Sequence, residues 1–219
     1  MRPAKPESPT LKARLKESGD AFPETFRVRL HRAISWLARA ERESDDHDAQ
    51  FVFLWIAFNA AYAREFGHDE PERERLRQFF SLLLSLDGEK RLHTLLHQHF
   101  TGPIRTMLDN KFVFEPFWRA LREHDASNRW EEKFVGARKI ALTALMSNDT
   151  ATLLSIVFDR LYVLRNQLIH GGATWNSGVN RAQVRDGAKI LAFLMPVFVD
   201  LMMDNWNKNW GKPFYPVVT

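Results

Sequence analysis

The sequence predicts an all-α protein, a bundle of about seven to nine helices with no significant sheet. Between turn signals, apolar residues recur at three- and four-residue intervals, which is the periodicity of helices that bury one face. No segment shows the strict alternation of apolar and polar residues that is typical of a strand. Of the 219 residues 45% are hydrophobic, so the chain can bury a substantial core.

A single domain, residues 23–206, is expected to contain these helices. Residues 1–22 carry three prolines among charged residues and no apolar core, so we expect a flexible basic tail and no secretory signal. Residues 207–219 include two prolines and are expected to form an extended C-terminal tail.

Turn signals divide this domain into segments. Pro23 suits the first turn of a helix, and Gly67 and Gly171 can end helices because glycine adopts the left-handed conformation. Pro196 predicts a kink inside the last helix. We therefore expect helices at about residues 23–43, 48–66, 70–86, 128–146, 150–170 and 181–206, with two or three shorter ones between residues 89 and 125. The second of these is apolar nearly all round and should lie at the centre of the bundle.

Composition excludes several classes of function. The chain has no cysteine, which rules out disulfides, thiolate metal sites and cysteine nucleophiles and agrees with a cytoplasmic protein. Its longest apolar runs, residues 51–58 and 190–199, fall short of the ~20 residues that span a bilayer, so we expect a soluble protein without membrane contact. No phosphate-binding glycine-rich loop and no GxSxG motif occurs. The formal net charge of +4 permits contact with a phosphate backbone without requiring it.

The helix at residues 150–170 carries the strongest candidate site. Its apolar residues follow one seam at three- and four-residue spacing, formed by Leu154, Val157, Leu161, Leu164 and Leu168. At about 100° per residue, Arg165 falls inside the arc of that seam. A buried guanidinium needs a partner, which another helix, another subunit or a bound phosphate could supply.

His170 lies at the accessible C-terminal end of the same helix. The helix dipole at that end favours a protonated imidazole, which suits a group that both accepts and donates protons. Asn166 precedes His170 by four residues and shares its face, so its amide could orient the imidazole or a substrate oxygen.

The string LRNQLIHGG resembles the signature of the HEPN superfamily, in which Arg, a polar residue often Asn, and a later His end a long apolar helix. Arg165, Asn166 and His170 match that motif. The stretch FVFLWIAFNAAYA at residues 51–63 resembles the second helix of an Apea-like HEPN branch. The resemblance covers roughly residues 23–206 and implies a HEPN-type bundle, with residues 67–146 as a branch-specific elaboration.

The resemblance also implies an activity. Active HEPN proteins are metal-independent endoribonucleases that form homodimers and need no cofactor, and they cleave RNA by 2′-hydroxyl attack to leave a 2′,3′-cyclic phosphate. Arg165, His170 and Asn166 would be the catalytic residues, with His170 as base or acid and Arg165 stabilising the phosphorane. A toxin or phage-defence role, with an antitoxin or a nucleotidyltransferase-like partner, is typical of such proteins. The alternative is a non-catalytic HEPN dimer that binds RNA, a nucleotide or a protein.

Other residues are candidates for supporting roles. Asn59 and Tyr62 on the second helix, and Tyr162 on the Arg165 helix, could support the site or contact substrate. His93 and His97 have the i, i+4 spacing that zinc can bridge, but two ligands do not make a site, so no metal is expected. Aromatic and cationic residues alternate between Phe114 and Trp130 in a way that would suit single-stranded RNA, although helical spacing also suits a core.

Overall fold

The structure is a computed structural model that describes residues 5–63, 72–178 and 180–215. Across these ranges the chain forms ten α-helices and no β-strand, which confirms the prediction of an all-α fold. In chain order these are α1 Ser8–Glu17, α2 Glu24–Ala40, α3 His47–Tyr62, α4 Glu72–Leu86, α5 Arg91–Thr94, α6 Thr101–Leu108, α7 Glu115–Arg122, α8 Arg129–Met146, α9 Thr150–Ile169 and α10 Arg181–Asp204. Short 3-10 turns occur at Gly19–Ala21 (η1) and Lys111–Val113 (η3), and a π-helical turn at Leu95–His99 (η2).

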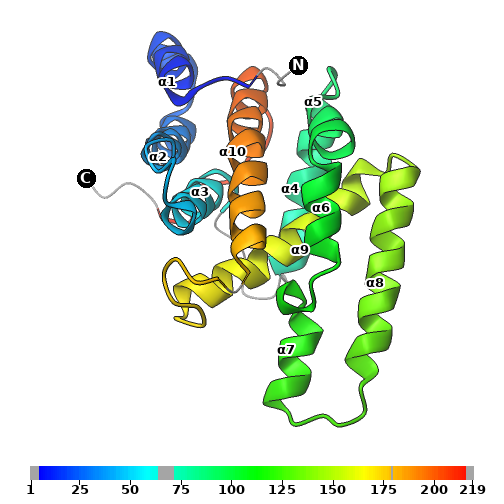
Figure 1. The fold of residues 1–219 in the computed structure, drawn as a ribbon. Helices are drawn as coiled ribbons and strands as arrows, with labels where there is room; N and C mark the ends of the chain where they lie inside the picture. The colour runs from blue at the N-terminus through cyan, green and yellow to red at the C-terminus, as the bar shows by residue number, and fades with distance from the viewer. Residues whose placement is uncertain (1–4, 64–71, 179, 216–219) are drawn as a thin grey trace.

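Helix α10 occupies the middle of the bundle (Figure 1). On one side of it α1, α2 and α3 are stacked, and on the other side lie α4, α5 and α6. Helix α9 crosses this arrangement obliquely, with its C-terminal end on the side of α3. Helices α7 and α8 form a hairpin that projects away from the bundle, and we call residues 115–146 the arm.

Four phenylalanines from four helices meet at the centre of the core. Phe158 of α9 lies with its ring centroid 4.7 Å from those of Phe58 on α3 and Phe80 on α4. Phe198 of α10 packs beside them, 6.2 Å from Phe158. All four side chains are at most 2% exposed, so α3 is central as its apolar sequence predicts.

The close approach of α10 to its neighbours depends on Gly187. A Cβ atom at this position would lie 2.9 Å from a methyl group of Leu161 and 3.1 Å from the Phe51 ring. Only glycine leaves room for that contact. It fixes the middle of α9 against α10 and thereby the direction in which the end of α9 leaves the core.

The prediction of a flexible tail was wrong for residues 8–17 of the expected range 1–22. Residues 8–17 form α1, whose Leu11 is fully buried in the main core. Arg14 of α1 forms an ion pair with Asp200 of α10 at 2.5 Å. One leucine and one ion pair are too few to mark an amphipathic helix in the sequence, yet both contacts attach α1 to the bundle. Because α1 was not expected, the number of described helices exceeds the expected seven to nine.

One boundary needs correction. Helix α3 ends at Tyr62, because Ala63 is extended, whereas the expected end at Phe66 and Gly67 lies outside the described residues. Within the segment expected as an elaboration, α4 contributes the buried Phe80 and Leu83 to the central core. The far end of the arm projects from the bundle, whereas Ala141, Ala144 and Leu145 of α8 are buried in the core.

The described helices include none that combines the length and the apolar character needed to cross a membrane.

Candidate functional site

Helix α9 begins and ends where its sequence predicts. The Asp149 carboxylate caps the first turn by accepting a hydrogen bond from the Thr152 amide at 3.1 Å. The helix ends at Ile169, and Gly171 has φ of +69°, the left-handed conformation expected there. The predicted seam is buried from Leu154 to Leu164 and becomes half-buried at Leu168. The last turn of α9 therefore emerges from the core.

Arg165 lies where the helix emerges and is half-buried. Its Nη1 donates a 2.8 Å hydrogen bond to Oδ1 of Asn166, and its guanidinium carbon lies 5.9 Å from the centroid of the Tyr162 ring. Its Nε is buried and has no hydrogen-bond partner in the described part of the chain. No carboxylate of residues 5–63, 72–178 and 180–215 forms an ion pair with this arginine. The cation thus keeps donors that a ligand could use.

His170 is exposed and forms the C-cap of α9. Its backbone amide donates to the Asn166 carbonyl at 3.0 Å, which holds the residue against the last turn. Because five helical steps rotate a side chain by about 140°, His170 and Arg165 leave the helix in different directions. A site that uses both groups therefore draws on two faces of α9, or on two copies of the chain.

Asn166 contacts Arg165. The sequence suggested that its amide orients the His170 ring or a substrate oxygen, and in the structure its Oδ1 accepts a hydrogen bond from Arg165. Its contribution to a site is through Arg165.

Of the three supporting candidates, the structure brings Tyr162 to Arg165 and leaves two elsewhere. The Tyr62 ring stacks on Phe58 at 4.7 Å, and Phe58 packs on Phe158, which is about 10 Å from Arg165 along α9. Asn59 lies in the same C-terminal half of α3 and, within the described ranges, its side chain has no hydrogen bond to Arg165. The sequence could not reveal that α3 runs against α9 and presents its first turn, not its last, to the Arg165 end.

That first turn of α3 holds the loop that follows His170. Nη2 of Arg181 lies 2.7 Å from both carboxylate oxygens of Asp48, which is 6% exposed. The Trp175 indole donates to Asp46 at 2.8 Å. The hydrogen bond from the Ala49 amide, together with that from Trp175, lowers the pKa of Asp46. These contacts hold Trp175 and Arg181 against the start of α3. Asp46 also caps α3, because it accepts a hydrogen bond from the Ala49 amide at 3.0 Å.

A chain of amide hydrogen bonds joins the last turn of α9 to the base of the arm. Gln167 donates through Nε2 to the Phe112 carbonyl at 2.5 Å and accepts at Oε1 from Asn180 at 2.9 Å. Asn180 in turn accepts from Asn110 at 3.1 Å. Three segments far apart in the sequence thus meet beside the candidate motif. No periodicity marks these residues, so sequence analysis missed them.

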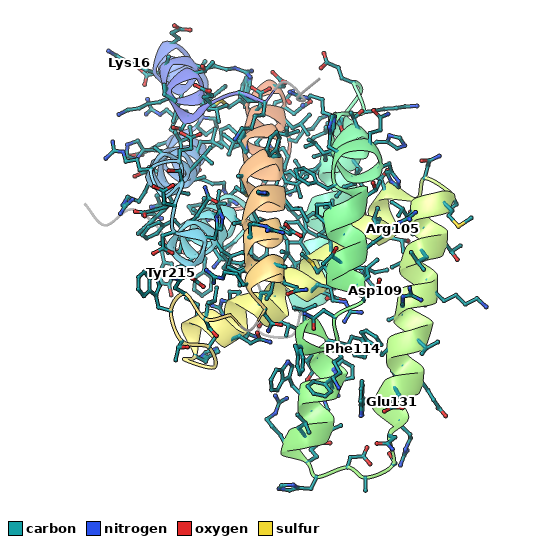
Figure 2. All side chains as sticks on the ribbon, in the orientation of Figure 1. Lys16, Arg105, Asp109, Phe114, Glu131 and Tyr215 are labelled. Carbon is teal, nitrogen blue, oxygen red and sulfur yellow. The ribbon has the colours of Figure 1, made fainter. Side chains whose placement is uncertain are left out.

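Arg160 is the most deeply buried cation of α9, and the sequence analysis missed it as well. It is 2% exposed, its Nη1 donates to the Val113 carbonyl at 3.4 Å, and its guanidinium carbon lies 4.3 Å from the Phe114 ring centroid. Figure 2 shows Phe114 where the arm joins the bundle. Burial lowers the pKa of Arg160 to about 10.

The histidine pair on η2 and α5 has structural contacts. The rings of His93 and His97 are stacked with centroids 4.5 Å apart. His97 donates from Nδ1 to the Leu145 carbonyl and accepts at Nε2 from Thr150, both at 3.3 Å. The described part of the chain holds no group of three or more His, Cys, Asp or Glu side chains placed to bind a metal ion.

Comparison with known proteins adds no relative: neither models of known families, nor curated proteins, nor solved structures match this chain.

Proposed function

We propose that this protein is a metal-independent endoribonuclease of the HEPN type, with its active site at the C-terminal end of α9. One observation carries the proposal: a half-buried arginine without a carboxylate partner among the described residues lies five residues before an exposed histidine at the C-terminal end of α9. A guanidinium in that state is suited to a phosphate, and an accessible imidazole is suited to proton transfer.

The residues suit transesterification of RNA. The ribose 2′-hydroxyl loses its proton to a base as its oxygen attacks the adjacent phosphorus, and the 5′-oxygen leaves with a proton from an acid. His170 supplies one of these proton transfers. Arg165 stabilises the charge on the phosphorane, held in orientation by Asn166. The products are a 2′,3′-cyclic phosphate and a 5′-hydroxyl, and DNA is not cleaved because it lacks the nucleophile.

A homodimer would combine the two faces of α9. Around the helix axis, Ile169 projects between Arg165 and His170, and its side chain is 48% exposed. The nearby Trp175 is 73% exposed, so the two side chains offer an apolar surface to a second copy of the chain. Two-fold pairing of these surfaces would bring Arg165 of one protomer near His170 of the other. Light scattering should show a dimer at micromolar concentration, and Ile169→Glu should give a monomer without cleavage activity. A wild-type monomer that still cleaves RNA would contradict this arrangement.

Cleavage in EDTA is the direct test of the activity. Purified wild-type protein should cut single-stranded RNA, and His170→Ala should reduce the rate by about 100-fold or more. His99→Ala is the matched control, because His99 is also an exposed histidine but lies on η2. Equal cleavage by both variants, or none by the wild type across many RNAs, would sink the proposal.

The second candidate is a non-catalytic module that binds RNA, a nucleotide or a protein. It is favoured by the apolar side chains that the arm exposes, Leu121 at 54% and Val135 at 65%. RNA that binds tightly but keeps its ends unchanged would select this candidate. A toxin or phage-defence role would be supported by a neighbouring gene for an antitoxin or a nucleotidyltransferase-like protein.

A further inference from the structure

An open groove of about 800 Å³ lies at the base of the arm, between η3 and α8. Three aromatic side chains line it: Phe112, Trp130 and Phe134. Two amide side chains, Asn110 and Gln183, lie in the same wall. This combination of apolar faces with a few polar groups, at this volume, is typical of ligand sites.

Charge in the groove is nearly balanced. Asp109 forms an ion pair with Arg138, which leaves Lys111 and Glu131 as the other charged lining residues. Figure 2 shows Asp109 at the end of α6 and Glu131 farther out on α8. A neutral groove with aromatic walls does not suit a phosphate chain. It suits flat, uncharged rings with hydrogen-bonding edges, which are the properties of nucleobases.

The aromatic walls are held in place before any ligand binds. The Trp118 indole donates to the Phe112 carbonyl at 2.8 Å, and the Trp130 ring packs edge-on against Phe117 with centroids 5.0 Å apart. Phe112 nevertheless remains 38% exposed. The Lys111 ammonium lies over the Phe112 and Trp130 rings, 5.5 and 5.8 Å from their centroids, so a base that stacks on either ring would have to share that face with the cation or use the other face. Rigid walls reduce the entropy lost on binding.

The groove is joined to the proposed active site. Phe112, which lines the groove, accepts the 2.5 Å hydrogen bond from Gln167 through its carbonyl. Gln167 lies between Arg165 and His170 in the last turn of α9. Asn110, in the groove wall, closes the same amide chain through Asn180. A nucleotide in the groove would therefore be held at a fixed position relative to that turn.

We propose that this groove binds unpaired bases of a single-stranded RNA whose phosphate is cleaved at the end of α9. The part of this inference that concerns cleavage rests on the proposed function. The binding of bases in the groove does not require that the RNA be cleaved. A duplex cannot use the groove, because its bases are paired and stacked within the helix.

Binding can be measured without cleavage by fluorescence anisotropy of a labelled, fully 2′-O-methylated RNA octamer. Trp130→Ala should weaken binding roughly 5- to 100-fold, since one base–aromatic stack is lost, and Trp130→Phe should restore most of it. Val135→Glu should also weaken binding, because Val135 lines the groove and is 65% exposed. Its matched control is Ile140→Glu, which adds the same charge to the same helix at a residue 58% exposed outside the groove.

The outcomes separate the two proposals. Equal binding by Val135→Glu and Ile140→Glu, or equal competition by duplex RNA, would overturn the groove assignment and leave the groove to a protein partner, even if the wild type cleaves RNA. Loss of binding in Val135→Glu and Trp130→Ala alone would support it, even if unmodified RNA stays uncut and the endoribonuclease proposal fails.

Discussion

The middle and the end of α9 each present an arginine, and the two arginines lie in opposite environments. Arg160 is 2% exposed and contacts the Val113 carbonyl and the Phe114 ring at the base of the arm. Arg165, five residues later, is half-buried and bound to Asn166. Neither forms an ion pair within the described residues.

If Arg165 serves a ligand as proposed, the more deeply buried of the two arginines is not the functional one. Arg160 is so enclosed that it can only act within the protein, where it joins α9 to the arm. Arg165 keeps a route to solvent while its Nε lacks a partner. A cation that serves a ligand must be desolvated enough to bind strongly and open enough to be reached.

The largest expected effect is on activity, from Arg165→Met. Removal of the guanidinium should reduce RNA cleavage about 100- to 1000-fold, because charge stabilisation of the phosphorane is lost. The thermal midpoint should change little, since the side chain is half-buried and the aliphatic part is retained. Single-turnover cleavage and a thermal melt measure the two effects. A folded variant with wild-type activity would place the active site elsewhere.

Arg160 should show the reverse behaviour. Arg160→Ala should destabilise the protein by about 2–4 kcal/mol through the cavity it leaves beside Phe114. Arg160→Met should remain within about 1 kcal/mol of the wild type, because the chain still fills the space and an unpaired buried charge is gone. Urea denaturation gives both values, and the cleavage rate of the folded fraction should be unchanged. A large loss of activity in a stable Arg160→Met would contradict the separation of roles.

A smaller effect concerns His97 of η2, which contacts Thr150 at the beginning of α9. Burial, with the charge of His93 as a second cause, lowers the pKa of His97 in the folded protein. The unfolded chain then binds more protons as pH falls through about 6.5, so the free energy of unfolding should decrease there and below. His97→Gln should flatten this decrease, whereas the exposed His99→Gln should not. An unchanged pH profile in His97→Gln would show that the imidazole is not the responsible group.

Much of the fold follows from sequence periodicity and turn chemistry. The seam of α9 and the left-handed Gly171 are local features, and both are found as predicted. Helix α1 was missed because its attachment depends on Leu11 and on an ion pair with Asp200, a partner 186 residues away. Local patterns carry no information about such partners.

Part of the candidate site was predictable because local sequence spacing fixes which residues of one helix are neighbours. Arg165, Asn166, His170 and Tyr162 share one helix, so their proximity follows from helical geometry. The assignment of Asn59 and Tyr62 required the relative direction of α3 and α9, which depends on packing of side chains such as Phe58. Gln167 and the groove likewise depend on tertiary contacts.

The chemistry of the RNA ends tests the central claim most directly. Wild-type protein should cleave single-stranded RNA in EDTA and leave a 2′,3′-cyclic phosphate and a 5′-hydroxyl, and His170→Ala should form these ends at least about 100-fold more slowly. Mass spectrometry of the fragments identifies these ends. Fragments with a 3′-hydroxyl and a 5′-phosphate, or cyclic phosphate produced equally by His170→Ala, would contradict the proposed site.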